Sequence, residues 1–255
     1  MSDPAPPPTA AASPRLPLSA ADLLLILILG LGLSRLVLPP LAGAFGLDPA
    51  QGLSGHLDLV LGLLLVQFGL LFAVVYAVAL RWRGARWRDL GFVALSPRWA
   101  GRALLLALLC LPLVGTISWI QQQITGAPFE NPQFEAIAPP AFAWRAYLGT
   151  LVVAAVLAPV VEEIVFRGLL YRWVRERLGV LPGVGISAVL FAVLHGIPGL
   201  IPGIIVLGAL LAVVYERAGS LWAPILVHGA YNALVTTALY VAIAQGLHPS
   251  EGLRP

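Results

Sequence analysis

The sequence predicts an all-α fold, a polytopic membrane protein of about seven to eight transmembrane helices. Two observations predict it. Of the 255 residues, 59% are hydrophobic and only 11% are charged, whereas a soluble domain carries about 25% charged residues. Several apolar stretches also approach or exceed the ~20 residues that cross a bilayer as a helix. So few charges cannot cover a water-soluble body of this length, and we expect the outer surface to face lipid.

The first part of the chain divides into a tail and a first apolar segment. Residues 1–17 are rich in Pro and Ala and predict a disordered tail, followed by a single membrane domain over residues 18–255. Leu23 to Leu38 is the first apolar run, and we expect Pro39-Pro40 to end it. Ala42-Gly43-Ala44 imitates a signal-peptidase site, so a cleaved signal segment is the alternative. We favour a retained helix, because the run is long for a signal peptide.

The remaining spans follow from the apolar runs in chain order, and the fifth and sixth are short for a full crossing. They are Leu57–Leu80, Arg102–Ile124, Trp144–Leu170, Val180–His195, Leu200–Tyr215 and Leu221–Ala244.

Charge in the connections predicts the orientation. Arginine clusters follow the second and fourth spans, whereas the connection 125–142 contains Glu130 and Glu135 but no basic residue. The positive-inside rule then places the N-terminus and the segments Arg81–Arg102 and Arg172–Arg177 in the cytoplasm, and an odd number of crossings places the C-terminus outside. Every Lys+Arg residue is arginine, which favours a bacterial source and hence the bacterial cytoplasmic (inner) membrane.

Composition also argues against two other kinds of site. The formal net charge is only +3 and the arginines stand between apolar runs, so we expect no nucleic-acid binding. Cys110 is the only cysteine, which rules out an intrachain disulfide and a cysteine-based metal site.

The informative residues are the polar ones inside apolar sequence, because a charge at the membrane centre costs about 2.5–3.5 kcal/mol even on lenient scales. Glu162 and Glu163 are followed by Arg167. On a helix Glu163 and Arg167 share a face and can pair, whereas Glu162 points about 100° away. This leaves one tethered and one freer carboxylate, and the freer one suits a general base. The alternative is that the trio anchors the helix end at the cytoplasmic interface.

Two of the four histidines also stand in apolar sequence. His195 ends a short apolar run beside a glycine, which alone is typical of a loop or core residue. His228 and Asn232 are four residues apart and therefore project from one helical face. Interhelical hydrogen bonding is the plain explanation, worth about 0.6 kcal/mol on average in membranes, and it accounts for one polar residue more easily than for two. One carboxylate, two imidazoles and an amide on three spans make a hydrolytic set.

These residues fall into ordered motifs. They are Ala158-Pro159-x-x-Glu162-Glu163-x-x-Phe166-Arg167-Gly168, Phe191-x-x-x-His195, and His228-x-x-x-Asn232, with Trp87-Arg88-Asp89-Leu90-Gly91-Phe92 before them and Gly219-Ser220-Leu221-Trp222-Ala223-Pro224 leading into the last. Together, over residues 87–232, they resemble the CAAX prenyl endopeptidase and bacteriocin-processing (CPBP, or Abi) membrane proteases.

The resemblance implies a polar intramembrane chamber that opens toward the cytoplasmic leaflet, and hydrolysis of peptide bonds. It implies that Glu162 is the base and that His195 helps to orient and polarise the water. It further implies that His228 and Asn232 donate hydrogen bonds to the oxyanion, and that Glu163 and Arg167 support the base. The expected partners are the lipid bilayer and a membrane-associated peptide or protein substrate.

Metal dependence and turnover have open alternatives. Glu162, His195 and His228 are residue types that zinc accepts, but no His-Glu-x-x-His helix is present. We favour a glutamate-type mechanism without a cofactor, with zinc as the alternative. A transporter or proton relay also uses intramembrane Glu, Arg and His, although the two halves show no internal repeat. A non-catalytic immunity or scaffold protein is the third interpretation.

Overall fold

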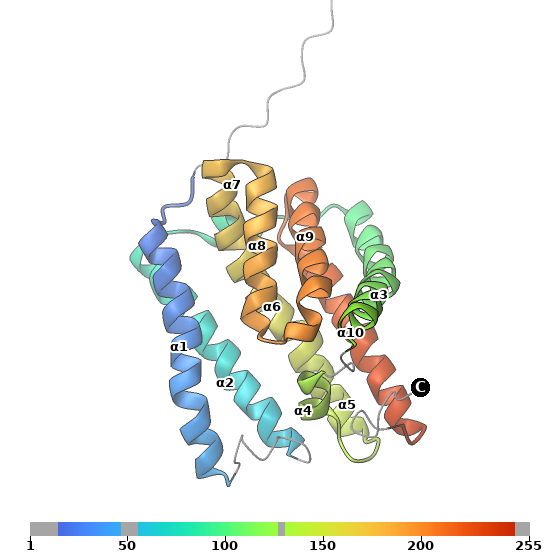
Figure 1. Ribbon diagram of the computed structural model, residues 1–255. Coiled ribbons are helices and arrows are strands. Elements are labelled where there is room, and N and C mark those ends of the chain that lie inside the picture. Colours follow the sequence, from blue (N-terminus) through green and yellow to red (C-terminus); the bar gives the residue numbers. More distant parts are fainter. Residues whose placement is uncertain (1–14, 47–55, 127–130, 248–255) are drawn as a thin grey trace, which may run out of the picture.

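The structure is a computed structural model, and it describes residues 15–46, 56–126 and 131–247. In these ranges every regular element is a helix, and Figure 1 shows the helices gathered into one bundle. The predicted all-α class is confirmed. Of the predicted tail, residues 1–14 lie outside the described residues. Its last residues are described, and Leu16 is buried against the bundle.

Six helices in the described residues are long and apolar enough to cross a membrane, and α8 is a shorter apolar helix. This agrees with a polytopic membrane protein. The long helices are α1 (Ala20–Ala44), α2 with η2 (Leu57–Val75 and Tyr76–Trp82), α3 (Pro97–Thr125), the segment Trp144–Leu178, η6 with α9 (Pro198–Leu200 and Ile201–Ala218) and α10 (Trp222–Ala244).

The first helix corrects one sequence-based boundary. Helix α1 does not end at Pro39-Pro40 but continues through both prolines to Ala44. A proline in a helix removes one backbone donor, and here the loss falls near the end of the helix, where few later turns depend on it. The start is fixed by Ser19, whose side chain accepts from the backbone N–H of Asp22 while the Asp22 carboxylate accepts from the Ser19 N–H.

The segment Trp144–Leu178 is one continuous helical rod whose winding changes along its length. It consists of α5 (Trp144–Leu151), η4 (Val152–Leu157), α6 (Ala158–Glu163), η5 (Ile164–Tyr171) and α7 (Arg172–Leu178), with η4 and η5 in π-helical geometry. Wider π-turns are frequent at functional sites, and here they flank Glu162 and Glu163 on both sides. The rod also runs past the predicted end at Leu170.

Helices α8 (Val180–His195) and α9 form a hairpin that packs on the rod. The connection begins at Gly196, which adopts φ +70° and so ends α8 directly after His195. Figure 1 shows that this turn lies at mid-height of the bundle, whereas α2, α5 and α10 extend farther down. The end of α8, where His195 stands, therefore lies at mid-height of the bundle, and His195 is partly exposed there.

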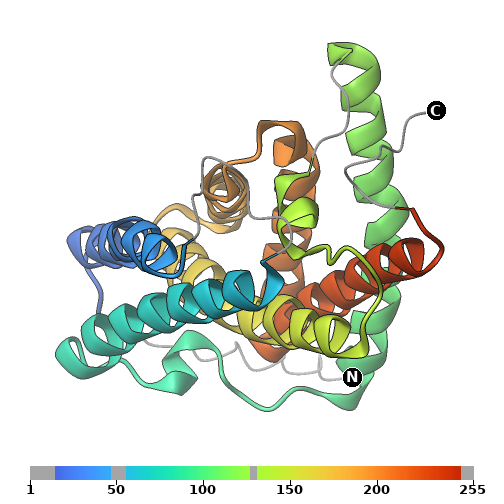
Figure 2. The same cartoon turned by 90° about the horizontal axis from the view of Figure 1, so that it is seen from below.

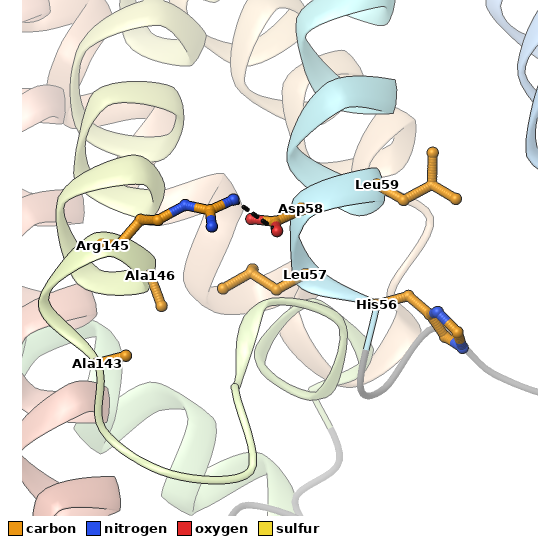
Figure 3. A pocket seen from close by; sticks show the side chains of 7 residues that line it. All are labelled: His56, Leu57, Asp58, Leu59, Ala143, Arg145 and Ala146. Atoms are coloured by element: carbon orange, nitrogen blue, oxygen red, sulfur yellow. Dashed lines mark hydrogen bonds and ion pairs between the residues drawn. The ribbon is translucent and has the colours of Figure 1, made fainter. Parts of the chain in front are cut away.

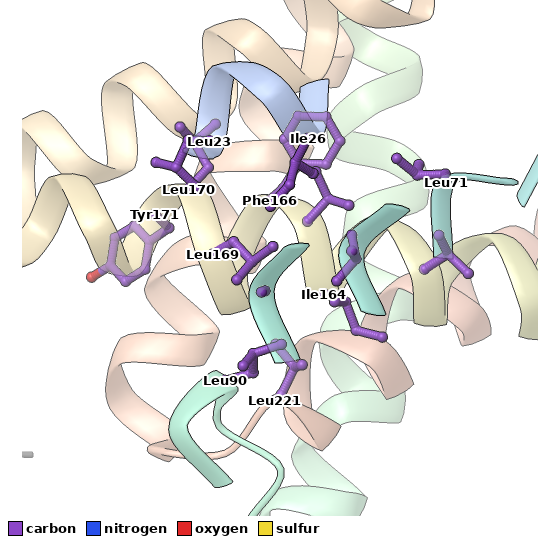
Figure 4. Close-up of a cluster of buried hydrophobic side chains, with 14 of the residues drawn as sticks. Leu23, Ile26, Leu71, Leu90, Ile164, Phe166, Leu169, Leu170, Tyr171 and Leu221 are labelled. Atoms are coloured by element: carbon purple, nitrogen blue, oxygen red, sulfur yellow. The ribbon is translucent and has the colours of Figure 1, made fainter. Parts of the chain in front are cut away.

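A short segment ties several helices together at the end of the bundle where α1 starts. It contains η3 (Trp87–Leu90), and the carbonyl of Gly91 accepts from the backbone N–H of Leu221 at 2.8 Å. Leu90 and Leu221 are fully buried and lie against each other in the core (Figure 4). A Cβ on Gly168 would stand 3.1 Å from the Leu90 carbonyl oxygen, so the small residue lets η3 approach the rod.

The other end of the bundle has a smaller core. Helix α4 (Pro132–Ile137) lies there, and the Tyr240 hydroxyl of α10 donates to the Ile137 carbonyl at 3.1 Å. Viewed from below, α1 and α2 lie together on one side, and α3 and α10 lie together on the other (Figure 2). The end of α10 is opposite to the start of α1 (Figure 1), as an odd number of crossings requires.

Candidate active site

The centre of the candidate site is a buried ion pair on the rod. Glu163 and Arg167 are both 0% exposed, and the Arg167 guanidinium donates to Glu163 Oε1 at 2.9 Å. The predicted pairing of these two residues is confirmed. Their burial contradicts the alternative of an interfacial anchor, because an anchoring arginine reaches the headgroups and Arg167 does not.

Arg167 is held by two further contacts from the α8–α9 hairpin. Its second terminal nitrogen donates to the backbone carbonyl of Gly208 at 2.8 Å, and its guanidinium carbon lies 4.6 Å from the centroid of the Phe191 ring. A cation over an aromatic face gains more when both are desolvated. The guanidinium thus has a carboxylate, a carbonyl and a ring as partners, which suits a charge removed from water.

Gly208 is a structural requirement that the sequence does not signal, because it contributes only a backbone carbonyl. A Cβ at this position would stand 3.1 Å from Ala188 Cα. The glycine therefore allows α8 and α9 to approach closely while presenting its carbonyl to Arg167.

Glu163 also binds the last helix. His228 Nδ1 lies 2.9 Å from Glu163 Oε1, and His228 is almost fully buried. The other ring nitrogen, Nε2, lies 3.8 Å from Glu162 Oε2. The Glu162 side chain is 18% exposed whereas that of Glu163 is 0%. The structure thus has the predicted tethered and freer carboxylates, with His228 between them.

His195 contacts the same Phe191 ring that His228 contacts. Its Nδ1 is 2.7 Å from the Phe191 carbonyl oxygen, which can only accept, so Nδ1 carries the hydrogen and Nε2 is left for other partners. Phe191 makes edge contacts with both imidazoles, at 4.6 Å for His195 and 5.7 Å for His228. Among the described residues His195 makes no hydrogen bond or ion pair to Glu162, and its contacts link it to Phe191 instead.

Asn232 faces the rod from the same side of α10 as His228, as the sequence predicts. Its Nδ2 donates to the carbonyl of Ala154 at 2.8 Å. Ala154 lies in the π-helical η4, where altered winding changes the intrahelical pairing of carbonyls. This contact uses one of the two Nδ2 hydrogens and leaves the second.

Two buried polar atoms of the ion pair have no hydrogen-bond partner among the described residues, Glu163 Oε2 and Arg167 Nε. Unpaired buried polar atoms are rare in folded proteins and often mark a functional site or a bound water. Glu163 Oε1 and the terminal nitrogens of Arg167 are therefore hydrogen-bonded, whereas Glu163 Oε2 and Arg167 Nε can each accept or donate one further hydrogen bond.

The side chains do not form a ready metal site. No group of three or more His, Cys, Asp and Glu side chains within residues 15–46, 56–126 and 131–247 is arranged to hold an ion. Glu162, His195 and His228 include suitable ligand types, but His195 is not gathered with the other two.

A shallow pocket lies elsewhere on the molecule and contains none of these residues. It is lined by residues of α2 and α5 with those just before them, including the exposed pair Asp58–Arg145 at 2.6 Å (Figure 3). Exposed ion pairs of this kind contribute little to stability.

Comparison with known proteins agrees with the sequence motifs. Residues 144–234 match the model of a protein family described as type II CAAX prenyl endopeptidase Rce1-like. The matched segment is less than half of the chain but contains all six residues predicted for the site, and the resemblance to the CPBP proteases is confirmed over it. The search of curated proteins and the search of solved structures each found no match.

Proposed function

We propose that this chain is an intramembrane endopeptidase that hydrolyses peptide bonds of membrane-associated peptides or proteins. The observation that carries the proposal is the position of the Glu162 carboxylate, partly exposed and 3.8 Å from a histidine that is itself fixed by a buried ion pair. The family match over residues 144–234 supports protease chemistry of the CAAX type.

In the proposed reaction Glu162 takes a proton from a water molecule while the water oxygen attacks the peptide carbonyl carbon. His195, with Nδ1–H bound to the Phe191 carbonyl, presents Nε2 as an acceptor that orients this water. The carbonyl oxygen becomes an oxyanion. Glu162 then passes its proton to the departing nitrogen, the C–N bond breaks, and a carboxylic acid and an amine result.

His228 and Asn232 stabilise the oxyanion in this proposal. For His228 this requires a hydrogen on Nε2 in addition to the one on Nδ1 that faces Glu163, so the ring acts as an imidazolium. In that state Glu162, Glu163, Arg167 and His228 carry two negative and two positive charges, and the site has no net charge to bury. Asn232 contributes its second Nδ2 hydrogen, since the first is donated to Ala154.

The proton-relay alternative fits the contacts less well. A relay needs groups that can release and regain partners, whereas Glu163 and Arg167 are fully buried and joined to α9 and α10 by short hydrogen bonds. The pair is arranged as fixed support for a neighbouring reactive group.

The decisive experiment compares the wild type with Glu162→Gln, using full-length protein in detergent and a peptide tethered to a lipid anchor. We expect peptide cleavage to fall by at least about 100-fold, because removal of a general base costs about 10²–10⁴ in rate. The glutamine has the same shape, so the thermal unfolding midpoint should change little.

The matched control is Glu135→Gln, which makes the same chemical change at an exposed carboxylate on α4. It should cleave at the wild-type rate. Cleavage by Glu162→Gln at the same rate as the control would contradict the base assignment, and no cleavage by the wild type of any tethered peptide would favour a non-catalytic protein. Metal analysis of the purified chain, with activity measured after chelation, tests the zinc alternative.

A further inference from the structure

The end of the bundle at which α1 starts carries a surplus of arginine. We call it the arginine-rich end; it comprises the start of α1, the segment from η2 to the start of α3, the ends of α7 and α9 and the start of α10 (upper part of Figure 1). Every described carboxylate at this end already has an arginine partner. The pairs are Asp22–Arg83 at 2.8 Å, Asp89–Arg86 at 3.0 Å, Glu176–Arg172 at 2.9 Å and Glu216–Arg175 at 2.7 Å.

Five more arginines in η2, η3, α3 and α9 have no such partner. In the described part of the chain each is exposed and forms no ion pair: Arg81, Arg88, Arg98, Arg102 and Arg217. Because the described acids nearby already have arginine partners, no described carboxylate balances these five charges. The described residues thus leave a positively charged surface, which attracts negatively charged partners.

Exposed aromatic rings lie among these arginines. Trp87 and Trp222 are 38% and 43% exposed, and they are joined through Phe92 by ring contacts of 5.6 and 5.2 Å. The guanidinium of Arg102 lies 5.3 Å from the Trp99 ring centroid. Tryptophan side chains prefer the level of the lipid headgroups, where the ring meets acyl chains and the N–H meets polar groups.

The opposite end lacks this combination. Its described charges are the pair Asp58–Arg145 and the exposed Glu135, so no positive surplus arises there. The asymmetry identifies the arginine-rich end as the surface that would attract anions.

We propose that the arginine-rich end binds the headgroups of anionic phospholipids selectively, with Arg88 and Arg217 as charge contacts and Trp87 and Trp222 at the boundary with the acyl chains. A phosphodiester headgroup supplies the missing negative charge, and the aromatic rings explain why a lipid fits better than a soluble anion. This inference does not depend on the proposed protease activity.

The test uses full-length protein in vesicles that mix phosphatidylcholine with phosphatidylglycerol, one of the two carrying brominated acyl chains. Bromine quenches nearby tryptophan fluorescence, so the difference between the two labelling schemes gives the local preference for phosphatidylglycerol. We expect enrichment of phosphatidylglycerol around the wild type. Each arginine near a membrane surface contributes about fivefold, so Arg88→Gln/Arg217→Gln should lower the enrichment by at least about fivefold.

The matched control is Arg35→Gln/Arg145→Gln, which removes the same charge from exposed arginines away from this end. It should keep the wild-type enrichment. The proposal would be overturned if brominated phosphatidylcholine and brominated phosphatidylglycerol quenched the wild type equally. It would also be overturned if both double variants lost the enrichment of phosphatidylglycerol to the same extent. Inorganic phosphate at millimolar concentration should leave the enrichment unchanged. Competition by phosphate would show a general anion site instead of a lipid surface.

Discussion

At the scale of single residues, Glu163 holds the site together because it has partners on two elements. One carboxylate oxygen accepts from Arg167 in its own rod and faces Nδ1 of His228 in α10. A buried charge is tolerated only when it is paired and hydrogen-bonded. The contact with Glu163 also fixes the orientation of the His228 ring, so both the ion pair and the His228 position depend on one carboxylate.

We therefore expect Arg167→Leu to destabilise the protein by about 3–5 kcal/mol, because it leaves the Glu163 charge buried without its cation. The measurement is thermal or denaturant unfolding of the purified protein in detergent.

The matched comparison is the double variant Glu163→Gln/Arg167→Leu, which removes both charges. It should recover part of the lost stability, since an uncharged pair has less to desolvate. If the double variant lost as much stability as the sum of the two single variants, Glu163 and Arg167 would stabilise the protein independently. That result would contradict the ion pair between them.

The sequence predicts part of this residue-scale arrangement. The spacing of Glu163 and Arg167 on one helical face predicts their ion pair, and the spacing of His228 and Asn232 predicts a shared face. The partner of His228 Nδ1 could not be predicted, because residues 163 and 228 lie on separate helices and no local rule fixes the packing of one on the other. The Gly208 and Ala154 carbonyls give no signal at all, because any residue has a carbonyl.

At the scale of elements, α10 is held against the rod by very close packing. A Cβ on Gly229 would stand 2.5 Å from the Ala155 carbonyl oxygen. Helices in membranes associate through such small residues, since lipid gives no hydrophobic drive toward packing. Gly229 directly follows His228, so the close approach sets the depth at which His228 reaches Glu163.

Gly229→Ala should then cost about 1–3 kcal/mol of stability and lower peptide cleavage, because the added methyl group moves α10 away from η4. Unfolding in detergent and the tethered-peptide assay measure the two effects.

Gly69→Ala is the matched control, since a Cβ there has nothing within 4 Å. It should be neutral or stabilising by up to about 1 kcal/mol, because alanine is the better helix former. Equal behaviour of the two alanine variants would contradict the assigned close approach.

Most elements follow from hydropathy alone. The predicted span Val180–His195 has the bounds of α8. The other predicted spans agree with the helices to within about five residues, except at the end of α1 and at the end of the rod. The prolines of α1 do not stop it, and the rod continues past Leu170 through the arginines of α7. The π-turns around Glu162 and Glu163 are not predictable from composition, because hydropathy indicates that a segment is helical but not how the helix is wound.

At the scale of the whole molecule, the start of the described chain is fastened to the rod. Leu16 and Leu18 are each 3% exposed, and the Leu18 carbonyl accepts from Trp173 Nε1 at 2.9 Å. The Leu16 N–H donates to the Glu176 carboxylate at 3.0 Å. This segment therefore connects α1, which carries none of the site residues, to α7 at the end of the rod that carries Glu162 and Glu163.

Leu18→Ala should lower stability by about 2–5 kcal/mol, as for other leucines buried in a core. Leu24→Ala, at a 57% exposed position of α1, should change it little because the side chain has few protein contacts to lose. Thermal unfolding in one detergent compares them. Equal losses would mean that the segment before α1 does not pack on α7 as described.

The position of the buried ion pair within one rod also bears on how the chain enters the membrane during synthesis. Arg167 follows Glu163 by a single turn, so the two charges can neutralise each other within a nascent helix, before α9 and α10 have left the ribosome. The Gly208 carbonyl and then His228 arrive later, in chain order. A pair divided between distant helices would expose a lone charge to lipid at the insertion step, whereas in this chain the Glu163 carboxylate enters the membrane with its cation on the same helix.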